Sequence, residues 1–171
     1  AFVLIKFIIY PGLGFVLGTT HPIVAVVSGS MEHKITYDGI NKDSPYRLCS
    51  EYFEERESVD FDKYWTVCGS WYEEHEITKE EFKAFPYYNG FNTGDIMVLI
   101  GAEPEDIKTG DVVVFVGTRP DPIIHRVVKV WQEDGKYQYQ TKGDHNQDSS
   151  GFELMISEER IIGKALIRVP F

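Results

Sequence analysis

From residue 94 onward the chain is divided into short apolar runs bounded by glycine, aspartate or proline, and this pattern constrains the fold most. The runs are rich in valine, isoleucine and tyrosine, which favour pleated strands. The stretch Glu133-Asp134-Gly135-Lys136 adds an Asp-Gly pair, which predicts a tight hairpin. The runs are GDIMVLIG, GDVVVFVG, PIIHRVVKVW, KYQYQTKGD and RIIGKALIRVP, with residues 22–27 as a further candidate strand. We therefore predict a mainly β protein with a compact β-sheet or barrel-like core.

Composition limits the class of protein. The chain has 171 residues, of which 43% are hydrophobic and 26% charged, a balance typical of a folded domain of one sizeable core. Its formal net charge is −10, so there is no basic excess to displace counterions from a phosphate backbone. Nucleic acid is therefore not an expected partner.

The N-terminal stretch AFVLIKFIIYPGLGFVLG is apolar apart from Lys6 and Tyr10. As a helix it would span roughly 27 Å, against about 30 Å for a hydrocarbon core. Lys6 is costly at a bilayer centre but can reach the interface from near the end of a span. We interpret residues 1–20 as a transmembrane anchor, complete or truncated. A cleaved signal peptide and a buried core helix are the alternatives.

Residues 34–92 interrupt the β pattern with an acidic segment that we expect to be partly helical. Asp43-Ser44-Pro45 resembles a helix start before YRLCSEYFEERE, and Thr78 with Glu81 matches a capping box. The segment is predicted to be a solvated insertion, with partner docking or a lid as the alternative. Cys49 and Cys68 allow either one disulfide or two buried thiols.

Candidate catalytic residues lie outside this insertion. A serine hydroxyl needs an adjacent base, and Ser28 and Ser30 follow the apolar N-terminus in the stretch VVSGSMEH. His125, within a predicted strand, is the histidine best placed to accept a proton. Asp144 and Asp148 follow the next strand and are candidates for orienting the imidazole. A histidine in a strand is also commonly structural, so the residues alone leave both interpretations open.

Taken together and in order, these motifs resemble the type I signal peptidases of the archaeal and endoplasmic-reticulum kind. The resemblance extends from about residue 22 to the end, except for the acidic insertion, and SGSM and HRV are its specific parts. The motifs are Ser28-Gly29-Ser30-Met31-Glu32, Gly94-Asp95-Ile96, Gly110-Asp111-Val112-Val113-Val114-Phe115, Ile124-His125-Arg126-Val127, Thr141-Lys142-Gly143-Asp144 and Gly163 followed by Val169-Pro170-Phe171.

The resemblance implies a role for each matching residue. Ser30 would be the nucleophile, and His125 stands where the bacterial branch has a lysine base. Ser28 and the backbone N–H of Ser30 would form the oxyanion hole. Asp148 is the preferred orienting carboxylate, and Asp144 is the alternative. Residues beside the catalytic groups would form shallow apolar pockets for small substrate side chains, and the candidates are Val27, Met31, Ile96 and Ile124.

Two features depart from the family pattern. Relatives usually carry proline two residues after the methionine, where this chain has His33, which we expect to face solvent. The insertion between Met31 and Gly94 is the second departure, and the short spacing between Asp144 and Asp148 adds to the difference.

The implied function is a membrane-anchored serine endopeptidase that removes signal peptides from secretory preproteins. Its active site would face the extracytoplasmic or lumenal side of the cell membrane or endoplasmic reticulum, and its partners would be preproteins and membrane lipid. No cofactor or metal is expected, since the five histidines lack the paired spacing of a zinc motif. Two alternatives are an inactive paralogue that binds a partner through its acidic insertion, and a self-cleaving repressor-type protease.

Overall fold

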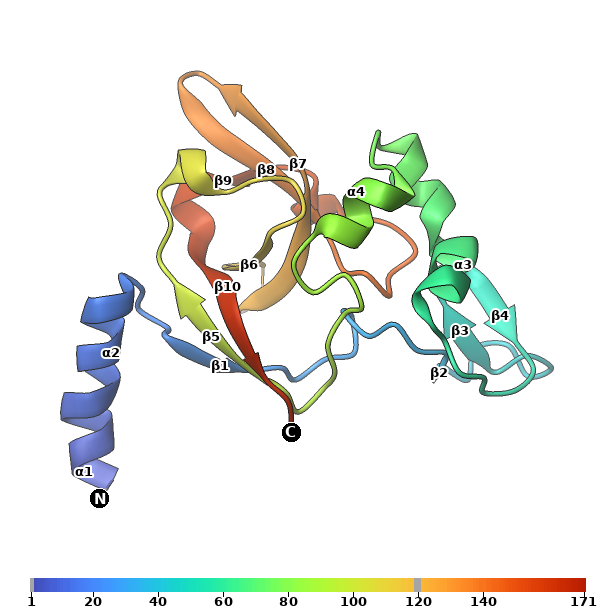
Figure 1. The fold of residues 1–171 in the computed structure, drawn as a ribbon, viewed down its shortest axis with the longest axis horizontal. Coiled ribbons are helices and arrows are strands. Elements are labelled where there is room, and N and C mark those ends of the chain that lie inside the picture. The colour runs from blue at the N-terminus through green and yellow to red at the C-terminus, as the bar shows by residue number, and fades with distance from the viewer. Residues whose placement is uncertain (1, 119–120) are drawn as a thin grey trace.

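A computed structural model describes residues 2–118 and 121–171, and its main element is a seven-stranded antiparallel sheet. The strand order is β1-β5-β10-β6-β7-β8-β9, and the sheet curves into a half-barrel (Figure 1). The prediction of a mainly β protein is confirmed. The strands are β1 (Ile23–Ala25), β5 (Ile96–Ile100), β6 (Val112–Phe115), β7 (Ile123–Glu133), β8 (Lys136–Lys142), β9 (Ile156–Ser157) and β10 (Ile161–Val169).

The strands form where the apolar runs predicted them. All four residues of β6 are buried because the strand lies between β10 and β7, which explains its unbroken apolar character. Between β7 and β8 the hairpin closes at Asp134 and Gly135, both with positive φ, as a two-residue turn of the predicted kind requires. Short 3-10 helices connect the strands: η2 (Pro104–Asp106), η3 (Gly151–Glu153) and η4 (Glu158–Arg160).

The acidic segment folds as a second layer with its own apolar core. It comprises a small sheet of β2 (Thr36–Tyr37), β3 (Tyr46–Leu48) and β4 (Glu51–Phe53), followed by α3 (Phe61–Glu74) and α4 (Lys79–Ala84). The buried side chains of Tyr64, Trp65, Tyr72 and Phe82 pack together, and Val128 of β7 joins them. Through Val128 the segment packs against the main sheet, beside which α3 and α4 lie (Figure 1).

The prediction of a helix following Pro45 is wrong, because the chain there forms the β3–β4 hairpin. Cys49 turns the chain with a φ of 52° and is joined to Cys68 of α3 by a disulfide. The local residues that resemble a helix start carry no information about this disulfide, which joins two different parts of the segment. The capping box at Thr78 and Glu81 is confirmed at the start of α4.

The N-terminal residues form one helical run of three pieces: α1 (Phe2–Leu4), the π-helical η1 (Ile5–Ile9) and α2 (Tyr10–Leu17). Within residues 2–118 and 121–171, no helix is both long and apolar enough to cross a membrane. The run ends at Gly18 and is tied to the sheet, since Gly101 N–H donates to the Leu17 carbonyl at 2.7 Å. It lies at the side of the sheet opposite α3 (Figure 1).

Candidate active site

Ser30 lies in a turn that directly follows the edge strand β1. The chain leaving β1 is held to β5 by two backbone hydrogen bonds, Val26 N–H to the Asp95 carbonyl and Gly94 N–H to the Val26 carbonyl, each 2.8 Å. The turn itself closes where Glu32 N–H donates to the Gly29 carbonyl at 3.0 Å. Ser30 therefore has a defined position beside the sheet, although its own residue is not in a strand.

His125 lies on β7, opposite Val113 of β6, and its side chain points toward the Ser30 turn. It is 6% exposed, and its Nε2 lies 2.9 Å from the Ser30 Oγ. A half-buried serine hydroxyl and a buried imidazole within hydrogen-bonding distance form the pair that nucleophilic catalysis requires. The structure thus brings together Ser30 and His125, which lie 95 residues apart in the chain.

Glu153 is the carboxylate that contacts the other side of His125. Its side chain is fully buried, and Oε1 accepts a hydrogen bond from His125 Nδ1 and another from Thr141 Oγ1 at 2.9 Å. Its other oxygen accepts from Ser150 N–H at 3.1 Å, in the capping box that begins η3. Burial alone would raise the pKa of Glu153, but the hydrogen bond and charge of His125, with the bonds from Ser150 and Thr141, lower it.

These contacts indicate which ring nitrogen of His125 carries the hydrogen. An ionised carboxylate can only accept, so His125 Nδ1 carries the hydrogen and its Nε2 is free to accept from the Ser30 hydroxyl. The Ser28 Oγ lies 3.1 Å from the Ser30 Oγ, which places a second hydroxyl beside that of Ser30. The arrangement Ser30–His125–Glu153 has the order of contacts of a serine-protease triad.

The two aspartates predicted to orient His125 contact other groups instead. Asp148 is at the surface, where its Oδ1 accepts from Trp71 Nε1 at 2.9 Å. Asp144 is fully buried and pairs with Arg126, the residue after His125. Successive side chains on a strand point to opposite faces, so a partner of Arg126 lies on the far face from the imidazole. The carboxylate that contacts His125 in the structure is therefore Glu153, not Asp148 or Asp144 as predicted.

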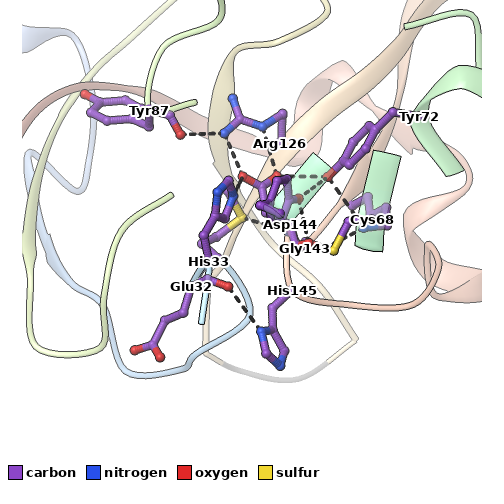
Figure 2. A network of polar contacts seen from close by, with 12 residues as sticks. Glu32, His33, Cys68, Tyr72, Tyr87, Arg126, Gly143, Asp144 and His145 are labelled. Atoms are coloured by element: carbon purple, nitrogen blue, oxygen red, sulfur yellow. Dashed lines mark hydrogen bonds and ion pairs between the residues drawn. The ribbon is translucent and has the colours of Figure 1, made fainter. Parts of the chain in front are cut away.

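Asp144 is the centre of a buried polar network (Figure 2). Arg126 Nε and Nη2 donate to its two oxygens at 2.9 and 2.7 Å, Tyr72 OH donates at 3.2 Å, and His33 Nε2 donates at 3.0 Å. Burial would raise the pKa of Asp144, but the Arg126 charge and these hydrogen bonds hold it well below its usual range. Burial also lowers the pKa of the neighbouring Lys142 to about 8. Asp144 is thus a structural anion.

His33 is buried, not solvent-facing as predicted. Its side chain is stacked on the Tyr64 ring of α3, with ring centroids 3.5 Å apart. It contributes a hydrogen bond to Asp144 and is 8% exposed. The acidic segment therefore contacts a residue that lies three positions after Ser30.

Gly143 permits the close approach of the site's parts. A Cβ at this position would lie 2.8 Å from the Ser30 carbonyl oxygen and 2.9 Å from His125 Nε2. The next residues continue the contact, since His145 N–H donates to the Ser30 carbonyl at 2.8 Å and its Nδ1 to that of Glu32 at 3.1 Å. The segment that follows β8 is thus hydrogen-bonded to the turn that contains Ser30.

The four predicted pocket residues have different environments. Val27 is 80% exposed, and Ile96 and Ile124 are half-buried, so these three remain accessible to a substrate. Met31 is only 1% exposed and packs in the core with Val26 and Phe91, while its Sδ accepts from Asp144 N–H. Met31 is therefore a core residue, and its prediction as a pocket wall is corrected.

Glu153 is the functional candidate that sequence reasoning missed. The pattern Ser150-Gly151-Phe152-Glu153 is a recognisable capping-box signature and marks a short helix. It does not reveal that the same carboxylate also reaches His125, because that contact depends on how η3 packs against β7 and β8. Over the described ranges, no group of three or more histidine, cysteine, aspartate or glutamate side chains is arranged to hold a metal ion.

Comparisons with known proteins give no family assignment. No protein-family model matches the chain, and no curated protein matches it significantly.

Proposed function

We propose that this chain is a serine endopeptidase in which Ser30 is the nucleophile, His125 the general base and Glu153 the group that orients the imidazole. The observation that carries the proposal is the continuous set of contacts from the Ser30 hydroxyl to Nε2 and from Nδ1 to a buried carboxylate. These contacts come from three separate parts of the fold. A fully buried glutamate with a lowered pKa is the kind of counter-ion that an imidazolium requires.

The proposed reaction uses each of these groups in turn. The Ser30 Oγ attacks the carbonyl carbon of the scissile peptide while its proton passes to His125 Nε2, and the carbonyl oxygen takes up negative charge. The Ser28 hydroxyl and the Ser30 N–H stabilise that charge. When the C–N bond breaks, His125 returns the proton to the leaving amine, leaving an acyl-enzyme. Water then attacks the ester by the same route and releases Ser30.

We further propose that the substrates are secretory preproteins and that the enzyme works at a membrane surface. The resemblance of the SGSM and HRV motifs to type I signal peptidases supports this substrate class. The N-terminal run exposes Phe7, Phe15 and Val16 and is tied at its end to the sheet, so lipid-facing attachment through residues 1–20 would hold Ser30 near the bilayer. The Cys49–Cys68 disulfide is consistent with an oxidising compartment outside the cytoplasm.

The test is cleavage of a preprotein in liposomes by the wild-type chain and by Ser30→Ala. Removing the nucleophile of a triad costs about 10⁶ in turnover, so cleavage should disappear in the variant. A fluorophosphonate reagent, which forms a covalent bond with an activated serine, provides a second readout that needs no knowledge of the preprotein. Asp148→Asn is the matched control, because this exposed carboxylate is bonded to Trp71 and not to the triad.

The two readouts test two parts of the proposal separately: whether Ser30 is an activated serine, and whether the substrates are preproteins. Labelling of the wild type but not of Ser30→Ala, with cleavage after small residues, supports a signal peptidase. Labelling without cleavage of any preprotein supports a serine hydrolase of other specificity. Equal inertness of both chains toward the reagent contradicts the enzyme, and the membrane-anchored partner-binding module then becomes the better explanation.

A further inference from the structure

His33 connects the nucleophile turn to a polar network that the proposed triad does not use. Its Nε2 lies 3.0 Å from Asp144 Oδ2, and the same oxygen accepts from Arg126 Nη2 at 2.7 Å. Figure 2 shows His33 and Arg126 directed at Asp144. Arg126 is adjacent to His125, and His33 is three residues after Ser30. Ser30 and His125, the proposed catalytic pair, are therefore each close in sequence to a residue that contacts the carboxylate of Asp144.

The contacts of His33 also define its protonation state. Asp144 can only accept, so His33 Nε2 carries a hydrogen, whereas the buried Nδ1 has no hydrogen-bond partner within the described residues. A second hydrogen on Nδ1 would be buried without an acceptor. It would also bring a third positive charge close to Arg126 and Lys142, around the single carboxylate of Asp144. Burial outweighs the attraction of Asp144 and lowers the pKa of His33, in agreement with a neutral ring.

The His33 ring is closely packed. Its face is stacked on Tyr64 at 3.5 Å between centroids and 3° between planes. Gly90 also lies close to the ring, since an added Cβ there would come within 2.7 Å of His33 Cδ2 and 2.3 Å of the Met31 carbonyl oxygen. The Phe91 N–H donates to that carbonyl at 3.1 Å. The side chain is therefore confined between α3 and the segment that precedes β5.

We propose that His33 is a positioning residue whose Nε2–H bond to Asp144 holds the turn that carries Ser30 against the strand that carries His125. The inference rests on the proposed function and extends it. At one end of this turn the Ser30 carbonyl is bonded to His145 N–H, and at the other end His33 is bonded to Asp144. Other backbone bonds, from His145 to the Glu32 carbonyl and from Phe91 to the Met31 carbonyl, also hold the turn, but the His33 bond is the one that joins it to Asp144 and, through Arg126, to β7. Loss of this bond should therefore loosen the contact between Ser30 Oγ and His125 Nε2.

Two substitutions separate the hydrogen bond from the packing. His33→Phe keeps a flat ring against Tyr64 but has no donor for Asp144, whereas His33→Gln restores an N–H at about the same reach. The matched control is His75→Phe, because His75 is also stacked on an aromatic ring, that of Trp71 at 3.7 Å, but has no contact with the nucleophile turn. The probe is the fluorophosphonate reagent, with the rate constant and the final extent of labelling recorded separately.

We expect His33→Phe to label Ser30 at least tenfold more slowly but to the same final extent, and His33→Gln to recover to within about threefold of the wild-type rate. A merely structural role would lower the final extent, which reports the folded fraction, and would leave the rate constant unchanged. In preprotein cleavage, kcat should fall with KM unchanged, because His33 is buried behind the turn. His75→Phe should match the wild type in every readout.

The proton on His125 Nδ1, observed by NMR, gives a readout independent of activity. Its resonance should lie far downfield in the wild type because of the contact with Glu153, and should shift in His33→Phe but not in His75→Phe. Wild-type labelling rate and an unshifted resonance in His33→Phe overturn the inference. Failure of the wild type to be labelled overturns the proposed function, and the resonance alone then decides whether loss of the His33–Asp144 bond changes how the Ser30 turn sits against His125.

Discussion

Replacing Glu153 by glutamine removes one charge from the proposed triad and changes almost nothing else in shape. The carboxylate it replaces is fully buried and accepts hydrogen bonds from three donors: His125 Nδ1, Thr141 Oγ1 and Ser150 N–H. A glutamine amide has one oxygen and one NH₂ group. Only its oxygen can accept a hydrogen bond, so the NH₂ group must point at one of the groups that donate to Glu153 in the wild type, and that pair of donors cannot form a hydrogen bond.

Each orientation of the amide has a defined consequence. If its oxygen faces Ser150 N–H, the NH₂ group faces His125 Nδ1, which must then give up its hydrogen. The ring carries its proton on Nε2 instead, pointing at the Ser30 hydroxyl, and it cannot act as a base. If the oxygen faces His125, the NH₂ opposes the Ser150 N–H and the start of η3 is disrupted. In both cases the imidazolium that forms during the reaction has lost its buried counter-ion.

The expected loss follows from the tautomer argument. Asparagine in the equivalent position of a serine-protease triad lowers kcat by about 10⁴ with the geometry intact, so we expect kcat for Glu153→Gln to fall by about 10³–10⁴. This corresponds to about 4–5.5 kcal/mol of activation free energy. The assay is single-turnover labelling by the fluorophosphonate reagent together with preprotein cleavage. Circular dichroism should show the wild-type fold, because the side chains have the same size.

Asp148→Asn is the control that decides between the two candidate carboxylates. Its Oδ1 contacts only Trp71 Nε1 and Ser149 N–H among the bonds of the described residues, and asparagine can accept from both. We expect activity within about twofold of the wild type. The reasoning is refuted if Glu153→Gln retains full activity while Asp148→Asn is inactive, because the carboxylate that orients His125 in the working enzyme would then be Asp148.

Two further predictions concern the scaffold around the site. Gly143→Ala should lower the labelling rate by at least 100-fold, because the new Cβ would lie 2.8 Å from a backbone oxygen of the nucleophile turn, whereas Gly12→Ala, which meets nothing within 4 Å, should have no effect. Replacing Cys49 and Cys68 by serine opens a loop with a sequence separation of 19. The free energy of unfolding, measured by urea titration, should fall by about 3 kcal/mol because the unfolded chain gains conformational freedom. An unchanged midpoint would show that the disulfide does not restrict the unfolded chain.

The predictable parts of the fold are those that depend on local pattern. The strands β5, β6, β7, β8 and β10 fall on the runs of branched and aromatic residues, and Asp134-Gly135 closes the hairpin as expected. Local signals fail where a distant bond competes with them. The chain after Pro45 has helix-start residues but becomes a hairpin, since the disulfide and the packing of Leu48 against α3 favour extended backbone there.

The candidate site divides in the same way. Ser30 and His125 could be proposed as a pair because the order of the motifs around them resembles that of the type I signal peptidases, whereas a serine in a turn and a histidine in a strand are each common on their own. Their orienting carboxylate could not be identified, because Asp144, Asp148 and Glu153 are chemically equivalent choices in a linear chain. Strand alternation turns Arg126, and hence Asp144, to the face opposite His125, and the capping box of η3 turns Glu153 inward.

The sequence by itself determined that this is a mainly β protein, because strand propensity and turn chemistry are local properties, and it offered Ser30 and His125 as a pair only through the order of motifs that resembles a known protease family. Only the tertiary structure decided which carboxylate contacts His125, that His33 is buried on Asp144, and that the acidic segment forms a buried apolar cluster with Val128 of β7. Those outcomes depend on contacts between residues far apart in the chain; His33 and Asp144, for example, are more than a hundred positions apart. A local sequence pattern contains no information about contacts over that separation.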